Sequence, residues 1–210
     1  MPDRSSPASR VRLFKSDRLE KLTFVSPIAF AVTWALLLPA IAWVGWGHAS
    51  LSQGIALYLG GLVIWTLFEY VMHRYLFHWK TDWKLGAWVV HVFHGNHHES
   101  PNDPYRNLMP PGGSLPIAAA VWALFVALVG PAGTWGFLGF IMGYVAYDIT
   151  HFACHQWPMR SRIGMMLKRH HMRHHYWDED TNFAITAIFW DKVFGTRVGV
   201  GKERAASLPD

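Results

Sequence analysis

Two long apolar stretches, and two shorter ones further along, determine what this chain can fold into. Residues 24–46 contain no charged side chain, and residues 51–72 contain only Glu69. At 1.5 Å per residue, each stretch is long enough to cross about 30 Å of hydrocarbon as a helix. Residues 115–129 and 134–152 flank a GPAG turn and fit a helical hairpin. We therefore predict an all-α integral membrane protein with four transmembrane helices at about these positions.

The positions of lysine and arginine predict how these helices are oriented. All nineteen lie in residues 1–22, 73–113 or 156–210, and the turns at 47–50 and 130–133 contain none. Because cytoplasmic loops carry the excess of Lys and Arg, we expect the three basic segments in the cytoplasm. We predict a multi-pass protein of a bacterial inner membrane with a cytoplasmic active site. The net charge of +5 follows this topology rather than a groove-binding stripe, so we expect no nucleic-acid partner.

The same pattern divides the chain into three parts. Residues 1–22 are expected to form an N-terminal tail, residues 23–198 a membrane domain, and residues 199–210 a C-terminal tail. The N-terminal tail is polar and basic, so we expect no cleavable signal peptide. The prolines and glycines at 110–113 predict a loop. Cys154 is the single cysteine, which excludes an intrachain disulfide, and we expect it to be a small packing residue.

Histidines gather near the predicted inner ends of the spans. Twelve of the thirteen fall into four groups, and members three or four residues apart share one face of a helix. The groups are His73 and His78; His91, His94, His97 and His98; His151 and His155; and His170, His171, His174 and His175. Neutral imidazole binds zinc, copper, iron or nickel. This number of ligands exceeds what one ion can use, so we predict two metal ions in a cytoplasmic helical cap.

Four sequence motifs agree in order and spacing with a known family. They are EYVMHRYLFH, HGNHHESPNDPYRNLMPP, GYVAYDITHFACH, and LKRHHMRHHY followed by NFAITAIFWDKVFGT. From about residue 60 to 198, the chain resembles the fatty acid hydroxylase superfamily of membrane di-metal oxygenases, and its sphingolipid fatty acid 2-hydroxylase branch in particular. The resemblance implies ten metal ligands, which are His73, His78, His94, His97, His98, His151, His155, His171, His174 and His175.

The resemblance also implies an activity. Members use two iron ions, dioxygen and external electrons to hydroxylate an acyl chain, so we expect a fatty acid or lipid substrate with C2 as the position. Zinc could replace iron in purified protein. We expect no fused cytochrome b5 domain, so electrons should come from a separate ferredoxin or cytochrome b5-like donor. Three residues depart from the family pattern: Gln156 replaces a histidine found in many members, Asn107 interrupts an R-L-V-M run, and Phe183 stands where glycine is common.

Three carboxylates are placed to support an all-histidine centre. Such a centre is strongly positive, and nearby carboxylates would offset its charge and orient imidazole N–H groups. Glu69, Asp148 and Asp191 fit this role, although each could equally cap a helix end. His91 and His170 remain outside the family pattern, and we expect both beside the site or on the surface. Helix geometry places His91 nearer the ligand face.

Other classes of function predict different patterns. A membrane b-type cytochrome would bury single axial histidines in mid-span, and a metal transporter would place ionisable residues at the bilayer midplane. Neither pattern occurs in these spans. A carotenoid or sterol hydroxylase with the same histidine motifs stays open. Aromatic residues around the motifs are expected to line an acyl groove or to lie at the membrane interface; they are Tyr70, Tyr75, Trp79, Trp88, Tyr147 and Trp157.

Overall fold

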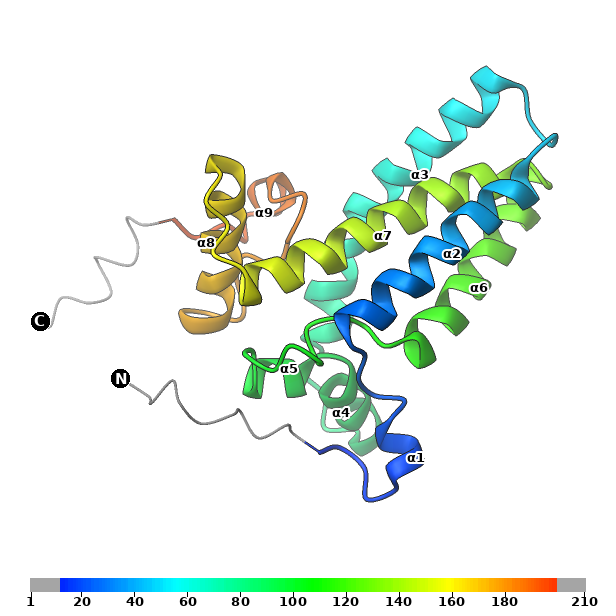
Figure 1. Cartoon of the computed structure of the whole chain (residues 1–210). Coiled ribbons are helices and arrows are strands. Elements are labelled where there is room, and N and C mark those ends of the chain that lie inside the picture. Colours follow the sequence, from blue (N-terminus) through cyan, green and yellow to red (C-terminus); the bar gives the residue numbers. More distant parts are fainter. Residues whose placement is uncertain (1–11, 200–210) are drawn as a thin grey trace, which may run out of the picture.

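The computed structural model describes residues 12–199, which form a bundle of four long helices joined to a smaller helical cap (Figure 1). The described residues contain helices and loops but no strand. In chain order the elements are α1 (Asp17–Glu20), α2 (Pro27–Gly45), α3 (Leu51–Val71), the π-helical η1 (Met72–Phe77), α4 (Lys84–Val90), the π-helical η2 (His91–Gly95), α5 (Asn96–Glu99), α6 (Pro111–Val129), α7 (Gly133–Gln156), α8 (Arg162–Tyr176) and α9 (Phe189–Val193). The predicted all-α fold is therefore confirmed.

Four helices are long and apolar enough to cross a membrane, as predicted: Pro27–Gly45, Leu51–Phe77, Pro111–Val129 and Gly133–Gln156. The prediction of a loop at 110–113 is wrong for residues 111–113, which form the start of α6. Pro111 begins α6, because proline at the first helical position lacks only an N–H that the helix leaves unpaired there. Pro39 lies inside α2, which continues past it to Gly45.

Helix α7 is the centre of the bundle. Helices α2, α3 and α6 each pack against α7. Helix α7 is mostly buried, whereas α6 is mostly exposed. Glycines allow the closest approach: a Cβ on Gly61 of α3 would lie 1.9 Å from the Gly136 carbonyl oxygen, and one on Gly139 would lie 1.9 Å from that of Tyr58. Small residues at such a contact let two helix backbones meet, which is how membrane helices gain packing energy.

Interlocked aromatic rings fill the bundle between these helices. The ring of Trp65 lies edge-on to Phe140 and Tyr144, with centroids 5.0 and 5.5 Å away, and Trp34 meets Tyr144 at 5.3 Å. Edge-to-face pairs of this kind are favourable beyond the area they bury. They fix the positions of α2, α3 and α7 relative to one another.

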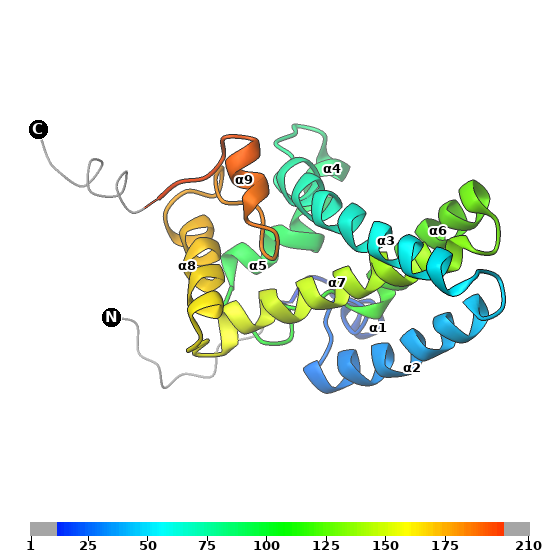
Figure 2. The same ribbon diagram turned by 90° about the horizontal axis from the view of Figure 1, so that it is seen from above.

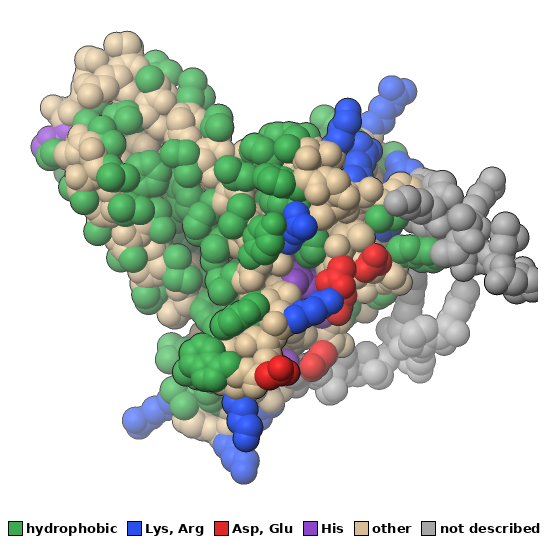
Figure 3. Space-filling view, turned by 180° about the vertical axis from the view of Figure 1, so that it is seen from behind, with side chains coloured by type: hydrophobic (Ala, Val, Ile, Leu, Met, Phe, Trp, Pro, Cys, Tyr) green, Lys and Arg blue, Asp and Glu red, His purple; other side chains and the backbone are tan. Residues whose placement is uncertain are grey.

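The cap lies at one end of the bundle, where α3 and α7 both run into it (Figure 2). It contains α4, α5, α8, α9 and the two π-helical turns. A buried ion pair between Glu20 and Arg106, at 2.7 Å, ties the segment before α2 to the loop before α6. Hydrophobic side chains cover the bundle, whereas the charged side chains visible from behind gather around the cap (Figure 3). This separation is typical of a membrane domain with a polar end.

Candidate metal centre

Ten histidines meet in the cap in two groups of five. The ligand nitrogens within each group all lie within 4.8 Å of one another. The first group is His73, His78, His94, His98 and His174. The second group is His97, His151, His155, His171 and His175. These are the ten residues that the motif resemblance names as ligands.

The elements around the groups explain how so many imidazoles converge. Helix α7 ends in the cap and presents His151 and His155 from its last turns, while η1, which continues α3, carries His73 and is followed by His78. The π-helical turns η1 and η2 add one residue per turn, which rotates His73 and His94 inward from continuous helices. Helix α8 contributes to both groups, with His174 in the first and His171 and His175 in the second.

Distances between ring nitrogens suit shared metal ions. In the first group, His94 Nε2 lies 3.0 Å from His73 Nε2 and 2.9 Å from His98 Nε2. In the second, His97 Nε2 lies 2.9 Å from His151 Nε2 and 3.0 Å from His175 Nε2. Two ligands at right angles around an ion, with bonds of about 2.0–2.1 Å, would be separated by about 2.9 Å. The spacing therefore fits coordination by one ion in each group.

Two buried atoms give a second indication that the residues fit metal ions. His78 Nε2 and His174 Nε2 are buried without a hydrogen-bond partner. Both belong to the first group, and an unsatisfied buried polar atom costs about 1–3 kcal/mol. A cation at the centre of the group would give each lone pair a partner.

The outer nitrogens of three ligands are held by backbone carbonyl groups. His73 Nδ1–H donates to Phe183 O, His174 Nδ1–H donates to Thr181 O at 2.8 Å, and His151 Nδ1–H donates to Asn107 O at 2.9 Å. Such a bond fixes the tautomer, so that Nε2 presents its lone pair to the group.

Burial keeps the cap histidines neutral. It lowers the pKa of His78 to about 4 and that of His98 to about 3, from an ordinary value of 6.5. The pKa values of His94, His97 and His171 also lie well below that value, first because of burial and then because of neighbouring histidines. A neutral imidazole is the form that binds a metal ion.

The three predicted carboxylates accept backbone N–H groups around the metal centre and make no hydrogen bond to the ten grouped imidazoles. Residues 181–186 form a strap across the first group, and its carbonyls at Thr181 and Phe183 accept the histidine bonds described above. Glu69 accepts N–H bonds from Ile185 at 2.8 Å and Thr186 at 2.7 Å. Glu69 therefore holds the strap in place from the end of α3.

Asp191 holds the same strap two residues earlier in the chain. Its carboxylate accepts the N–H groups of Phe183 at 2.8 Å and Ala184 at 2.9 Å, and it is fully buried. The third carboxylate, Asp148, accepts Met109 N–H at 3.0 Å and Tyr144 O–H at 2.8 Å, which ties α7 to the segment before α6.

Neither remaining clustered histidine belongs to a group of five. His170 is buried and its Nε2 lies 2.9 Å from Asp191 Oδ2, so it joins the support of the strap. His91 is partly exposed, and its Nδ1 lies 3.5 Å from Glu99 Oε1. Helix geometry predicted that His91 would lie closer to the ligands than His170. The structure shows the reverse, because His170 joins the hydrogen-bond network around the ligands.

Two residues that depart from the family pattern contact each other beside the second group. Gln156 Nε2–H donates to Asn107 Oδ1 at 2.8 Å, and the Asn107 side-chain amide lies 3.2 Å from His97 Nδ1. The backbone carbonyl of Asn107 also accepts the hydrogen bond from His151 Nδ1–H. Asn107 therefore contacts two members of the second group, a role that the motif comparison did not indicate.

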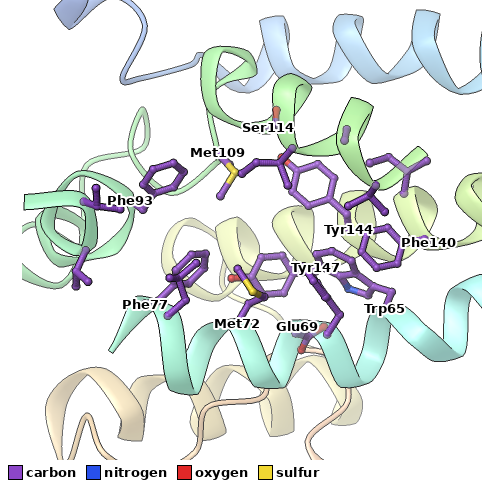
Figure 4. Close-up of a pocket in the computed structure, with 18 residues that line it drawn as sticks. Trp65, Glu69, Met72, Phe77, Phe93, Met109, Ser114, Phe140, Tyr144 and Tyr147 are labelled. Carbon is purple, nitrogen blue, oxygen red and sulfur yellow. The ribbon is translucent and has the colours of Figure 1, made fainter. Parts of the chain in front are cut away.

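An apolar cavity of about 270 Å³ runs beside the metal centre (Figure 4). Its walls come from α3, η1, α4, η2, α6 and α7, with Met109 from the loop before α6. A smaller and more polar cavity adjoins it, lined in part by His94, His97 and His151, and the two share Phe77, Phe93, Met109 and Tyr147. Phe77 stacks on His94 with centroids 5.2 Å apart, and Tyr147 stacks on His151 at 6.1 Å. The apolar cavity thus reaches both groups.

The sequence pattern identified little of this cavity. Of the six aromatic residues expected either in a groove or at the membrane interface, Tyr147 alone lines this cavity. Tyr70 instead stacks on Phe194 within the cap, and Trp79 and Trp88 are exposed. The lining residues that the sequence analysis did not identify recur at helical spacing on the facing sides of two spans. This spacing could have predicted the cavity. The residues include Trp65, Phe68, Met72 and Leu76 on one span and Phe140, Ile141 and Tyr144 on the other.

Comparisons with known proteins agree with these features. A family model described as fatty acid hydroxylase matches residues 58–196. The chain is 36% identical over 191 residues to the dihydroceramide fatty acyl 2-hydroxylase FAH1 of Arabidopsis thaliana, covering 88% of this chain and 79% of that protein. It is 44% identical over 150 residues to the ceramide very long chain fatty acid hydroxylase scs7 of Schizosaccharomyces pombe, covering 69% of this chain and 43% of that protein.

A solved structure shares the fold. It is titled full-length scs7p with only the hydroxylase domain visible. The similarity has a TM-score of 0.80 at 34% identity, and it covers 86% of this chain and 70% of that chain.

Proposed function

We propose that this chain, which belongs to the fatty acid hydroxylase family, adds a hydroxyl group to C2 of a fatty acyl chain. The family establishes a hydroxylase that acts on lipid acyl chains. The position at C2 is supported by relatives whose names specify 2-hydroxylation. The substrate would be a free fatty acid or an acyl group within a lipid such as a ceramide.

The observation that carries this proposal is the contact between the apolar cavity and both histidine groups. Phe77 and Tyr147 line the cavity and stack directly on members of different groups, His94 and His151. An acyl chain lying in the cavity would have its polar end in the adjoining polar cavity, among ligand histidines. This arrangement presents the first carbons of the chain to the metal centre.

We further propose that the ten grouped histidines hold two iron ions, with zinc as a substitute in purified protein. Bound iron would supply the activation of dioxygen, which consumes two external electrons. The chain's own residues keep the ligand nitrogens neutral and aligned, and they surround the reacting carbon with apolar side chains that exclude water.

The remaining parts of the proposal concern surroundings and partners. We propose a separate electron donor, a ferredoxin or a cytochrome b5-like protein. The cap would face the cytoplasm of a bacterial cell, as the distribution of basic residues favours. The division into tails at 1–22 and 199–210 and a membrane domain at 23–198 also stays a proposal.

Lipid analysis tests the function. Cells that lack 2-hydroxy lipids would express either the wild-type chain or His171→Ala, and acyl chains would be analysed by mass spectrometry. We expect 2-hydroxy acyl chains only with the wild-type protein. Unchanged acyl chains together with a new hydroxy-carotenoid or hydroxysterol would replace this proposal with the rival activity.

A further inference from the structure

We infer that Phe140 and Trp65 close the far end of the apolar cavity and set the length of acyl chain that the enzyme prefers. This inference rests on the proposed function, since it assumes that an acyl chain occupies the cavity. It adds a specificity determinant in the middle of the bundle, away from the metal centre.

The cavity has two distinct ends. Phe77 and Phe93 lie at the end toward the cap, and Phe140 and Trp65 lie at the other, with Met72 and Tyr147 between them (Figure 4). Phe77, Phe93 and Tyr147 also line the polar cavity that contains ligand histidines. The chain would therefore enter the apolar cavity from the metal end and extend toward Phe140.

The distance between the ends can be gauged along α7. His151 and Phe140 are eleven residues apart on this continuous helix, which corresponds to roughly 16 Å along its axis. The walls over this length are almost entirely hydrocarbon. A chain that fits the available length is buried throughout, whereas a longer chain would meet the aromatic rings.

The rings at the far end cannot easily move aside. Phe140 is 4% exposed and Trp65 is 7% exposed, and their centroids are 5.0 Å apart in an edge-to-face contact. Phe68 packs against both rings, at 5.7 Å from Trp65 and 5.1 Å from Phe140.

The backbone holds this arrangement as well. Trp65 lies over Gly143, where an added Cβ would be 2.5 Å from the indole ring. A closely packed interior resists such displacement. The position of the barrier is therefore set by α3 and α7 together.

Helix α6 offers a way to shorten the cavity. Ser114, Ile117, Ala118 and Val121 line it, so Ala118 lies part-way between the two ends. Replacing Ala118 by Phe would place a ring inside the cavity. Ala120 lies on the exposed side of the same helix and provides a matched control for the bulk and hydrophobicity of the change.

The test compares product profiles. Full-length protein would be given an equal mixture of saturated acyl substrates of increasing length, and 2-hydroxy products would be quantified for each length. Phe140→Ala should favour longer chains, by about fourfold for each additional methylene that the enlarged cavity buries. Ala118→Phe should favour shorter chains, and Ala120→Phe should keep the wild-type profile.

Each result has a defined meaning. Metal content would be measured for every variant, and Phe140→Leu would serve if Phe140→Ala does not fold. If wild-type protein forms no 2-hydroxy product, the proposed function fails. If wild-type protein forms it and neither Phe140 variants nor Ala118→Phe change the profile, the assignment of the cavity end is overturned while the function stands.

Discussion

The imidazole rings of His98 and His175 stack with centroids 4.2 Å apart, although they belong to different groups of five. Neighbours in the chain are also divided: His97 belongs to the second group and His98 to the first, because consecutive helical residues point about 100° apart. His174 and His175 are divided in the same way. Each H-x-x-H-H motif therefore supplies both sites, and the two ions would be neighbours.

Adjacent histidines should consequently affect different ions. We expect His97→Ala and His98→Ala each to lose about one ion per chain and to abolish hydroxylation, because each removes one ligand from a single group. The double variant should lose both ions. Metal analysis of purified protein, together with X-ray absorption of the retained ion, checks this. Loss of both ions from either single variant would show that the groups do not fill independently.

The strap over the first group provides a second prediction. In Asp191→Asn, an NH2 group would replace one oxygen that now accepts N–H bonds from the strap, which should shift Phe183 and weaken the hold on His73. We expect lower metal content and a loss of about 1–3 kcal/mol of stability. Metal analysis and thermal unfolding would measure both.

His170→Ala is the matched comparison for this variant. It removes one of the donors to Asp191 but leaves the N–H bonds from the strap. We expect close to two ions per chain and most of the activity. Loss of about one ion from His170→Ala would mean that this residue is a ligand.

The sequence predicted those features of the fold and the site that depend on the spacing of residues along the chain. Apolar stretches predicted the four spans, and histidine spacing predicted a metal centre. The motif resemblance, rather than the spacing, named the ten residues that meet in the cap. It did not predict how the ligands divide between two groups, because that depends on how α7 and α8 pack. The strap was also missed: its backbone carbonyls hold His73 and His174, and a backbone carbonyl leaves no residue-specific pattern.

Acid should destabilise the metal-free protein. The folded-state pKa values of the cap histidines are lowered, to about 4 for His78 and about 3 for His98, so the unfolded chain takes up protons first as pH falls below 6.5. Stability should be retained above that pH and should fall progressively toward pH 4. Thermal unfolding of metal-free protein in detergent at several pH values measures this, and a melting temperature independent of pH would contradict it.

Topology can be tested by cysteine labelling in intact cells. His48 is exposed in the turn between α2 and α3, and Pro131 is exposed between α6 and α7. We expect an impermeant reagent to label His48→Cys and Pro131→Cys from outside but not Arg162→Cys in the cap. The native Cys154 is buried and should give little background. Labelling of Arg162→Cys in intact cells would invert the proposed orientation.

The most direct test of the central claim follows a single oxygen atom. Purified protein loaded with iron would be supplied with an acyl substrate, an electron donor and isotopically labelled dioxygen, and the product would be analysed by mass spectrometry. We predict one labelled oxygen atom in a hydroxyl group at C2, and no such product from His171→Ala. A hydroxyl that carries unlabelled oxygen from water, or that stands at another carbon, would contradict the account of this protein as a dioxygen-dependent acyl 2-hydroxylase.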